Sequence, residues 1–177
     1  MPKDPAERTL YLLRHAKSSW DDPALADHDR PLAPRGHRAA ATIAGYVRER
    51  GIDPDLVVCS PALRTRQTLE LVADGLPAHR ASRVELVPGI YEASGADLLA
   101  IVRRLPDEVS TAMLIGHQPG IQDLALTLVG AGPGLARISG KFPTAALATV
   151  AVASAWNELG PGSGRLLDVA KPKQLQG

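Results

Sequence analysis

The chain has 177 residues, 45% of them hydrophobic and 22% charged, which suits one soluble domain with a sizeable core. Its 20 basic residues nearly balance its 19 acidic ones, which argues against nucleic acid or a membrane surface as the main partner. The single cysteine, Cys59, excludes an internal disulfide framework. No signal-peptide pattern or membrane-length apolar run is present, so we expect a cytoplasmic protein.

The first part of the chain predicts two strands and two helices in alternation. Thr9 to Leu13 is a short apolar run with the composition of a buried strand, and Leu56 to Cys59 has the same character. Between them, Pro34 to Arg50 is rich in alanine and arginine and predicts a helix that ends before a glycine. A second helix is predicted from Ser60, acting as N-cap, to about Asp74.

The second part continues the alternation. A helix is predicted over Asp97 to Leu105, a strand over Ala112 to Ile115, and a helix over Pro119 to Val129. Thr144 to Ala153 is ambiguous because alanine favours a helix while threonine and valine favour a strand, and we expect a strand. After a glycine-rich turn, Arg165 to Ala170 is predicted to return as an edge strand.

The order of these elements predicts the fold class. Strands that alternate with helices favour a three-layer α/β/α arrangement around a mostly parallel central sheet. We expect a single domain over residues 1–177, with residues 1–8 as a flexible tail. The sequence does not indicate an oligomeric state.

Histidine and arginine side chains follow three of the predicted strands. Arg14 and His15 come directly after the first strand, Arg64 lies shortly after the second, and His117 follows the strand that ends at Ile115. The carboxyl ends of parallel strands form a ligand crevice at one edge of a sheet. We therefore expect these four side chains to converge.

Such a set of side chains suits a phosphate dianion. Arginine forks pair with phosphate oxygens, and Arg64 is expected in the first turn of its helix, where the helix dipole adds to the attraction. A histidine nucleophile divides phosphoryl transfer into two easier steps through a covalent intermediate. The arginines disfavour the charged imidazole, so they lower the pKa of His15 and keep it neutral.

With these motifs the chain resembles the histidine phosphatase superfamily, whose fold is called phosphoglycerate mutase-like. The stretch LYLLRHAKSSW is similar to that of SixA-type phosphohistidine phosphatases, DRPLAPRG resembles the segment before the first helix of the family, and KPKQL resembles its ending. The resemblance assigns catalytic roles to Arg14, His15, Arg64 and His117. It implies a metal-independent phosphatase that needs no cofactor and forms a phosphohistidine on His15.

Several assignments stay open at this point. Gln118 stands where the family commonly has asparagine, which should alter hydrogen bonds around the site more than the catalytic set. Glu92 is the candidate proton donor, Glu85 is its rival, and a family member with no such acid is the third possibility. Lys17 and Ser18 are candidates for substrate binding. The loops at residues 19–30 and 88–95 are expected to surround the pocket.

The expected substrate is a phosphohistidine protein or a small phosphomonoester. The alternatives are a phosphoglycerate mutase-like phosphotransferase and a non-catalytic module that binds phosphoproteins, although pure binding needs no nucleophile. A cysteine phosphatase is rejected because the residues between Cys59 and Arg64 do not form a glycine-rich phosphate loop. The expected partner is a phosphorylated small molecule or a phosphohistidine protein as substrate, and neither nucleic acid nor a membrane is expected as a partner.

Overall fold

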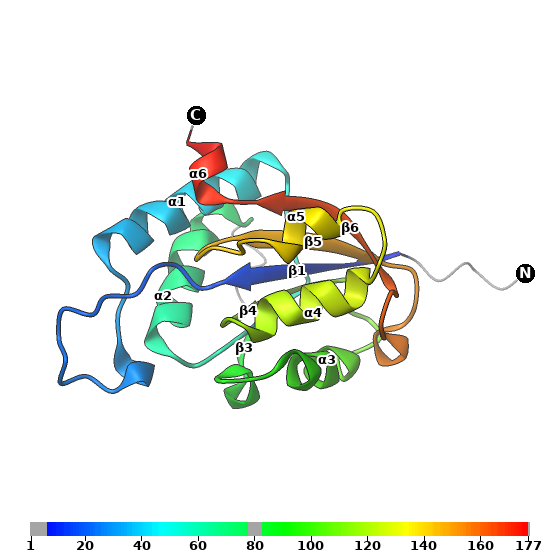
Figure 1. The fold of residues 1–177 in the computed structure, drawn as a ribbon, viewed down its shortest axis with the longest axis horizontal. Helices are drawn as coiled ribbons and strands as arrows, with labels where there is room; N and C mark the ends of the chain where they lie inside the picture. Colours follow the sequence, from blue (N-terminus) through cyan, green and yellow to red (C-terminus); the bar gives the residue numbers. More distant parts are fainter. Residues whose placement is uncertain (1–6, 78–82, 177) are drawn as a thin grey trace, which may run out of the picture.

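A computed structural model describes residues 7–77 and 83–176, and within them six strands form one sheet (Figure 1). The strand order is β3-β2-β4-β1-β5-β6. The strands are β1 (Arg8–Arg14), β2 (Leu56–Cys59), β3 (Val84–Leu86), β4 (Thr111–Gly116), β5 (Leu147–Val152) and β6 (Gly164–Ala170). The pairs β1–β4, β4–β2 and β2–β3 are parallel, whereas β5 is antiparallel to both β1 and β6.

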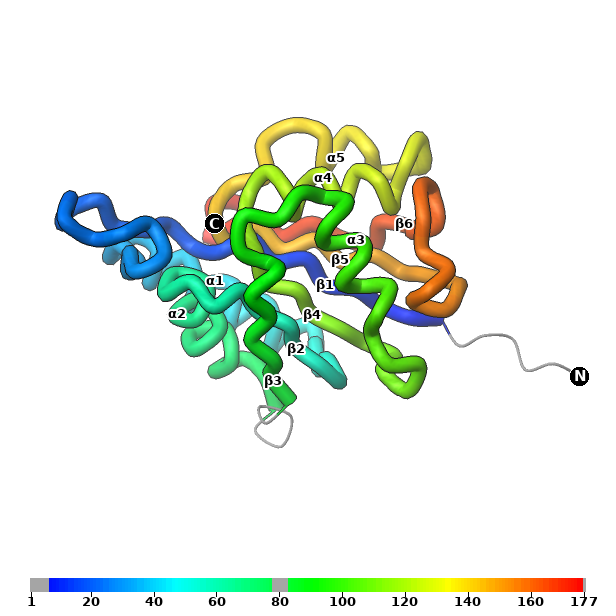
Figure 2. The backbone as a smooth tube through the Cα atoms, turned by 90° about the horizontal axis from the view of Figure 1, so that it is seen from below, coloured from blue at the N-terminus to red at the C-terminus, as the bar shows by residue number. Residues whose placement is uncertain are grey.

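Helices cover both faces of the sheet, which confirms the predicted α/β class with a mostly parallel sheet. The α-helices of the described residues are α1 (Pro34–Glu49), α2 (Leu63–Val72), α3 (Gly95–Arg103), α4 (Gly120–Val129), α5 (Leu135–Ser139) and α6 (Pro172–Leu175). In Figure 2, α1 and α2 lie on one side of the strands, and α3, α4 and α5 lie on the other. No helix in the described part of the chain is long and apolar enough to cross a membrane.

The core has two parts, one on each face of the sheet. Leu12 and Leu114 pack in the cluster that contains α3 and α4, whereas Leu13 and Ile115 pack in the cluster that contains α1 and α2. Successive side chains of a strand point to opposite faces, so a strand covered on both sides must be apolar at every position. This is why the short continuous apolar runs are good strand signals in this chain.

Most of the predicted elements are confirmed, although most of their ends differ by one to three residues, and α3 covers Gly95–Arg103 rather than 97–105. β5 covers Leu147–Val152 rather than 144–153. The prediction that Ser60 is the N-cap of the second helix is wrong, because α2 begins at Leu63 and its N-cap is Ala62. The Ser60 hydroxyl instead lies 2.7 Å from Nε2 of His117. Ser60 therefore belongs to the polar contacts of the strand end and not to the helix.

A few elements were not predicted. β3 has three residues with exposed side chains, and α5 and α6 have five and four residues, so each is too short to produce a periodic pattern. Residues 1–6 of the expected tail lie outside the described part of the chain. Arg8, at the end of that expected tail, is already the first residue of β1.

Candidate active site

The three central strands bring the predicted histidines together at one edge of the sheet. Arg14 pairs in register with Gly116 across β1 and β4, and Cys59 pairs with Ile115 across β2 and β4. The next residues along each strand are therefore neighbours. The ring centroids of His15 and His117 are 5.2 Å apart. The convergence expected from the sequence is present in the structure.

The imidazole of His15 is oriented with one nitrogen fixed by the backbone. Its Nδ1 lies 2.7 Å from the carbonyl oxygen of Ala16, and because a carbonyl only accepts, Nδ1 carries the proton. The lone pair of Nε2 is then available for bond formation. Burial lowers the pKa of His15 to about 4, with smaller contributions from Arg64 and Arg14, so the ring is neutral at pH 7. The sequence correctly implicated the arginines, but burial has the larger effect.

His117 has the opposite tautomer for an equally local reason. Nη2 of Arg64 lies 3.3 Å from Nδ1 of His117, and a guanidinium only donates, so Nδ1 accepts. Nε2–H of His117 then donates to the hydroxyl of Ser60. Burial lowers the pKa of His117 to about 3, with further lowering by His15 and Arg64. Because Nε2 of His117 already carries a proton, it does not accept one from Ser60, and this pair is not an activated serine.

The two arginines are held in place through different partners. Nη1 of Arg14 donates to the carbonyl of Phe142 at 2.9 Å, while its Nε is buried and has no hydrogen-bond partner. Arg64, which is 7% exposed, is the second residue of α2 and donates to the backbone carbonyl of Asp27 at 2.8 Å. A buried donor without a partner is costly. A bound anion is the natural acceptor for the Nε of Arg14.

Polar residues of α2 other than Arg64 hydrogen-bond this helix to the segments that precede it. Thr68 accepts a hydrogen bond from the backbone N–H of Ala16 at 2.9 Å, directly after the proposed nucleophile. Gln67 accepts one from the N–H of Leu32 at 2.8 Å, and Thr65 donates to the carbonyl of Ser60 at 2.9 Å. These bonds fix Arg64 relative to His15, which explains the polar residues on this short helix.

Asp27 is a site residue that the sequence did not single out. One carboxylate oxygen lies 3.0 Å from Nη2 of Arg64 and accepts a hydrogen bond from the Tyr91 hydroxyl at 2.7 Å, and the other pairs with Arg30 at 3.1 Å. The Tyr91 hydrogen bond is the main cause that lowers the pKa of Asp27, and Arg64 and Arg30 add to it. Its loop contains four aspartates with no local pattern to distinguish them. Only the folding of that loop over α2 selects Asp27.

The candidate acids from the sequence lie in more open positions. Glu92 is exposed and has a φ of 58°, and within the described residues no hydrogen bond or ion pair ties it to the catalytic set. Its neighbour Tyr91 packs edge-on against His117, with centroids 5.5 Å apart. Glu85 is exposed on the edge strand β3. The two loops that were expected to surround the pocket, residues 19–30 and 88–95, thus contact the site residues through Asp27 and Tyr91.

The remaining candidates have distinct surroundings. Ser18 accepts a hydrogen bond from Arg30 at 2.7 Å, and Lys17 is exposed beside a basic pocket described below. Gln118 donates to the side chain of Gln122 at 2.8 Å, and within the described residues its side chain makes no hydrogen bond with His117. Burial raises the pKa of the Cys59 thiol to about 12, so no thiolate forms at neutral pH.

The fold and these side chains define a class of protein: an α/β domain with paired histidines and arginines at the carboxyl edge of a parallel sheet, where a phosphate group would fit. The sequence profile of the histidine phosphatase superfamily (branch 1) matches residues 10–110. The chain belongs to this superfamily, which confirms the resemblance seen in its motifs.

Individual relatives agree with this assignment. An uncharacterised protein of Mycobacterium tuberculosis is 39% identical over 165 residues, which are 91% of this chain and all of that protein. The phosphohistidine phosphatase SixA of Escherichia coli is 28% identical over 84% of this chain and 88% of its own length. A solved structure of the protein histidine phosphatase SixA with tungstate superimposes with a TM-score of 0.77 at 26% identity, covering 94% of this chain and 99% of that one.

The lowered pKa values predict the behaviour of the two histidines in solution. The pKa of His15 is about 4 and that of His117 about 3, so both rings should stay neutral as the pH falls from 8 to about 5. Their imidazole resonances, assigned with the His15→Ala and His117→Ala variants, should not move over this range in an NMR titration. A midpoint near 6.5 for either ring would show that burial has little effect on it.

Proposed function

We propose that this protein is a metal-independent phosphatase that transfers a phosphoryl group from its substrate to Nε2 of His15 and then to water. The observation that carries the proposal is the hydrogen bond from Nδ1–H of His15 to the Ala16 carbonyl at 2.7 Å. It leaves a neutral nitrogen lone pair beside two arginines. A binding module would need the arginines but not this oriented and neutral nucleophile.

The first chemical step forms the phosphohistidine. The lone pair of Nε2 bonds to phosphorus, and the bond from phosphorus to the leaving group breaks with its electrons on the leaving group, which then takes a proton. Arg14 and Arg64 face the charge on the equatorial oxygens. In the second step, water attacks phosphorus, the bond to His15 breaks, and inorganic phosphate is released together with a proton.

The substrates supported by this site are a phosphohistidine protein or a small phosphomonoester. The SixA relatives are named for phosphohistidine, and their similarity extends over most of both chains. Phosphohistidine requires little acid assistance, because an imidazole nitrogen leaves more readily than an alkoxide. Hydrolysis of an alkyl phosphomonoester should therefore depend on a strong proton donor, whereas hydrolysis of phosphohistidine should not.

The proton donor is proposed to be a carboxylate at the edge of the pocket. The sequence points to Glu92, whereas the contacts of the structure favour Asp27, which touches Arg64. In the free protein the pKa of Asp27 is lowered, so the group is ionised. A phosphate dianion that pairs with Arg64 would place negative charge beside Asp27 and raise its pKa, because like charges disfavour ionisation. Substrate binding would then protonate the acid.

Replacement of each carboxylate distinguishes the two candidates. Asp27→Asn should lower turnover of an alkyl phosphate by about 10²-fold or more, while largely sparing an aryl phosphate and phosphohistidine, because only the alkoxide needs a strong acid. Glu92→Gln should then behave like wild type. The measurement is turnover of all three substrates by both variants.

The controls concern the second role of Asp27 as a partner of Arg64. Tyr91→Phe removes the phenol that hydrogen-bonds to Asp27 but keeps the carboxylate, so it should retain most of the alkyl phosphate activity. Equal losses on all three substrates in Asp27→Asn would mean that Asp27 positions Arg64 and donates no proton. The reverse pattern, with the selective loss in Glu92→Gln, would assign the acid to Glu92.

Activity is expected to survive removal of divalent metal ions. Two fixed guanidinium groups already supply positive charge, and within residues 7–77 and 83–176 no group of three or more potential ligands is placed to hold a metal ion. Dialysis against a chelator should leave hydrolysis of an aryl phosphate unchanged. Loss of activity that returns on addition of Mg²⁺, Mn²⁺ or Zn²⁺ would contradict this prediction.

A further inference from the structure

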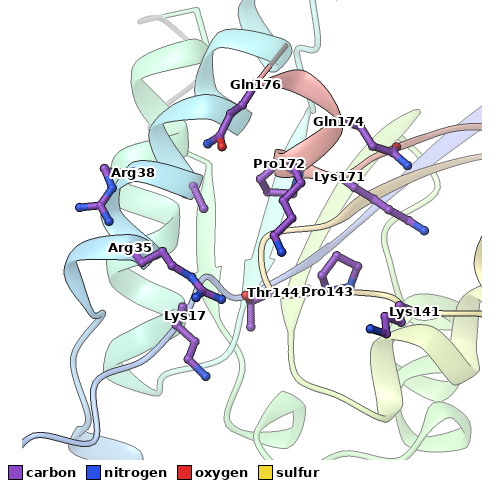
Figure 3. Close-up of a pocket in the computed structure, with 12 residues that line it drawn as sticks. Lys17, Arg35, Arg38, Lys141, Pro143, Thr144, Lys171, Pro172, Gln174 and Gln176 are labelled. Carbon is purple, nitrogen blue, oxygen red and sulfur yellow. The ribbon is translucent and has the colours of Figure 1, made fainter.

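A basic pocket adjoins the candidate active site. It has a volume of about 680 Å³ and lies between the first turns of α1, the segment 141–144 and α6 (Figure 3). Among residues 7–77 and 83–176, no acidic residue lines it. Six cationic residues do: Lys17, Arg35, Arg38, Lys141, Lys171 and Lys173. We call this the cationic pocket.

The lysines of this chain are unusually concentrated there. Four lysines fall within the described residues, and all four line the cationic pocket. Figure 3 shows the Arg35 guanidinium pointing toward Thr144, with Lys17 and Lys141 on either side of Thr144 and Pro143. Although the net charge of the sequence is close to zero, these residues form a local excess of positive charge that comes from four separate segments of the chain.

The cations of the pocket also differ from most other cations in the described part of the chain in their interactions with neighbouring residues. Within the described residues, none of the six side chains makes an ion pair or a hydrogen bond. By contrast, a carboxylate pairs with each of Arg30, Arg64, Arg137 and Arg165. A backbone carbonyl accepts from each of Arg48, Arg66 and Arg103. Clustered like charges repel one another, and an anion bound between them would relieve that repulsion.

The cationic pocket is connected directly to the proposed nucleophile. Lys17 is two residues from His15, and even a fully extended chain would separate their Cα atoms by at most about 7 Å. The N–H of Ala145, next to the pocket residue Thr144, donates to the carbonyls of Arg14 and His15 at 3.1 and 3.0 Å. One ligand of modest size would therefore reach both the nucleophile and the cationic pocket.

We propose that the cationic pocket binds a second phosphate group of a small, multiply phosphorylated substrate while the reacting phosphoryl group lies at His15. This inference rests on the proposed function and narrows its substrate class. The volume of the pocket falls within the roughly 300–1,000 Å³ of small-ligand sites. Lysine and arginine are the residues that recognise phosphate. Pro143, Pro172 and Ala39 add apolar wall for the uncharged part of such a molecule.

The test compares inorganic tripolyphosphate with orthophosphate. The Lys141→Gln/Lys173→Gln variant removes two pocket cations that take no part in the proposed chemistry. An Arg104→Gln/Arg165→Gln variant removes two exposed cations from other elements as a matched control. Calorimetry gives the Kd of each probe, and inhibition of p-nitrophenyl phosphate hydrolysis gives its inhibition constant and type.

The pocket variant should bind tripolyphosphate at least about tenfold more weakly than the wild type and the control, with orthophosphate binding changed less than about twofold. Tripolyphosphate should inhibit competitively, and p-nitrophenyl phosphate turnover should be unchanged. Equal tripolyphosphate affinity in both variants would overturn the proposal. So would non-competitive inhibition, which indicates a separate site, or tighter binding of an oligoglutamate peptide, which indicates an acidic protein.

The same experiment separates this inference from the proposed function. If wild type binds tripolyphosphate through the pocket but hydrolyses no phosphate ester or phosphohistidine, the proposed function fails and the anion site remains. If hydrolysis proceeds and the pocket variant binds tripolyphosphate like wild type, the inference fails and the proposed function remains.

Discussion

Replacement of His15 by alanine should lower phosphatase turnover by at least about 10³-fold, because the variant has no nitrogen lone pair to form the covalent intermediate. The wild-type protein, quenched during turnover, should carry phosphate on the peptide that contains His15. That linkage should be labile to acid and stable to alkali, as expected for a phosphohistidine. Mass spectrometry of the quenched protein locates the phosphate.

His37→Ala is the matched control, since His37 is an exposed histidine on α1. It should keep full turnover and form the same phosphorylated peptide. Circular dichroism of the His15→Ala variant checks that its fold is retained. Near-normal turnover in a folded His15→Ala protein would reject the mechanism. A phosphate that maps to His117 or Ser60 would move the nucleophile to that residue.

Arg64→Lys should lower kcat by about 10²- to 10³-fold, although it conserves the charge. The guanidinium reaches the Asp27 carboxylate and Nδ1 of His117 at once, from a position that is 7% exposed. A lysine ammonium offers a compact point charge and cannot reproduce this planar fork. Steady-state kinetics with an aryl phosphate measures the change, and Arg64→Ala should lose at least as much.

Arg66→Lys provides the comparison two residues further along α2. Arg66 is exposed and donates to the carbonyl of Pro61, away from the histidines. Its conversion to lysine should leave kcat within about threefold of wild type. If Arg64→Lys behaved in the same way, Arg64 would lie outside the catalytic machinery, and the proposed phosphate contacts would be wrong.

The fold was predictable because its signals are local and agree with one another. Runs such as Leu56 to Cys59 are apolar at every position, as a strand that is buried on both faces requires. The segments that failed are short or irregular. Ser60-Pro61 has the composition of a helix start, yet a strand-end contact with His117 holds Ser60, so the helix begins at Leu63. A long-range hydrogen bond overrode the local preference.

The positions of Arg14, His15, Arg64 and His117 were predictable for a related reason. Each lies within five residues of a strand end, and neighbouring parallel strands bring such ends together whatever the loops do. The sequence could not predict which nitrogen of His15 carries the proton. That depends on the turn that directs the Ala16 carbonyl back to Nδ1.

What the sequence by itself determined is the superfamily, the α/β sheet and the four residues at its strand ends, because all of these follow from short local patterns. Only the tertiary structure decided that Asp27 meets Arg64, 37 residues later in the chain, and that four lysines with two arginines gather around one pocket. Both depend on how a loop, the first turns of α1 and the end of the chain pack against each other. Such contacts join distant segments, so no local pattern records them.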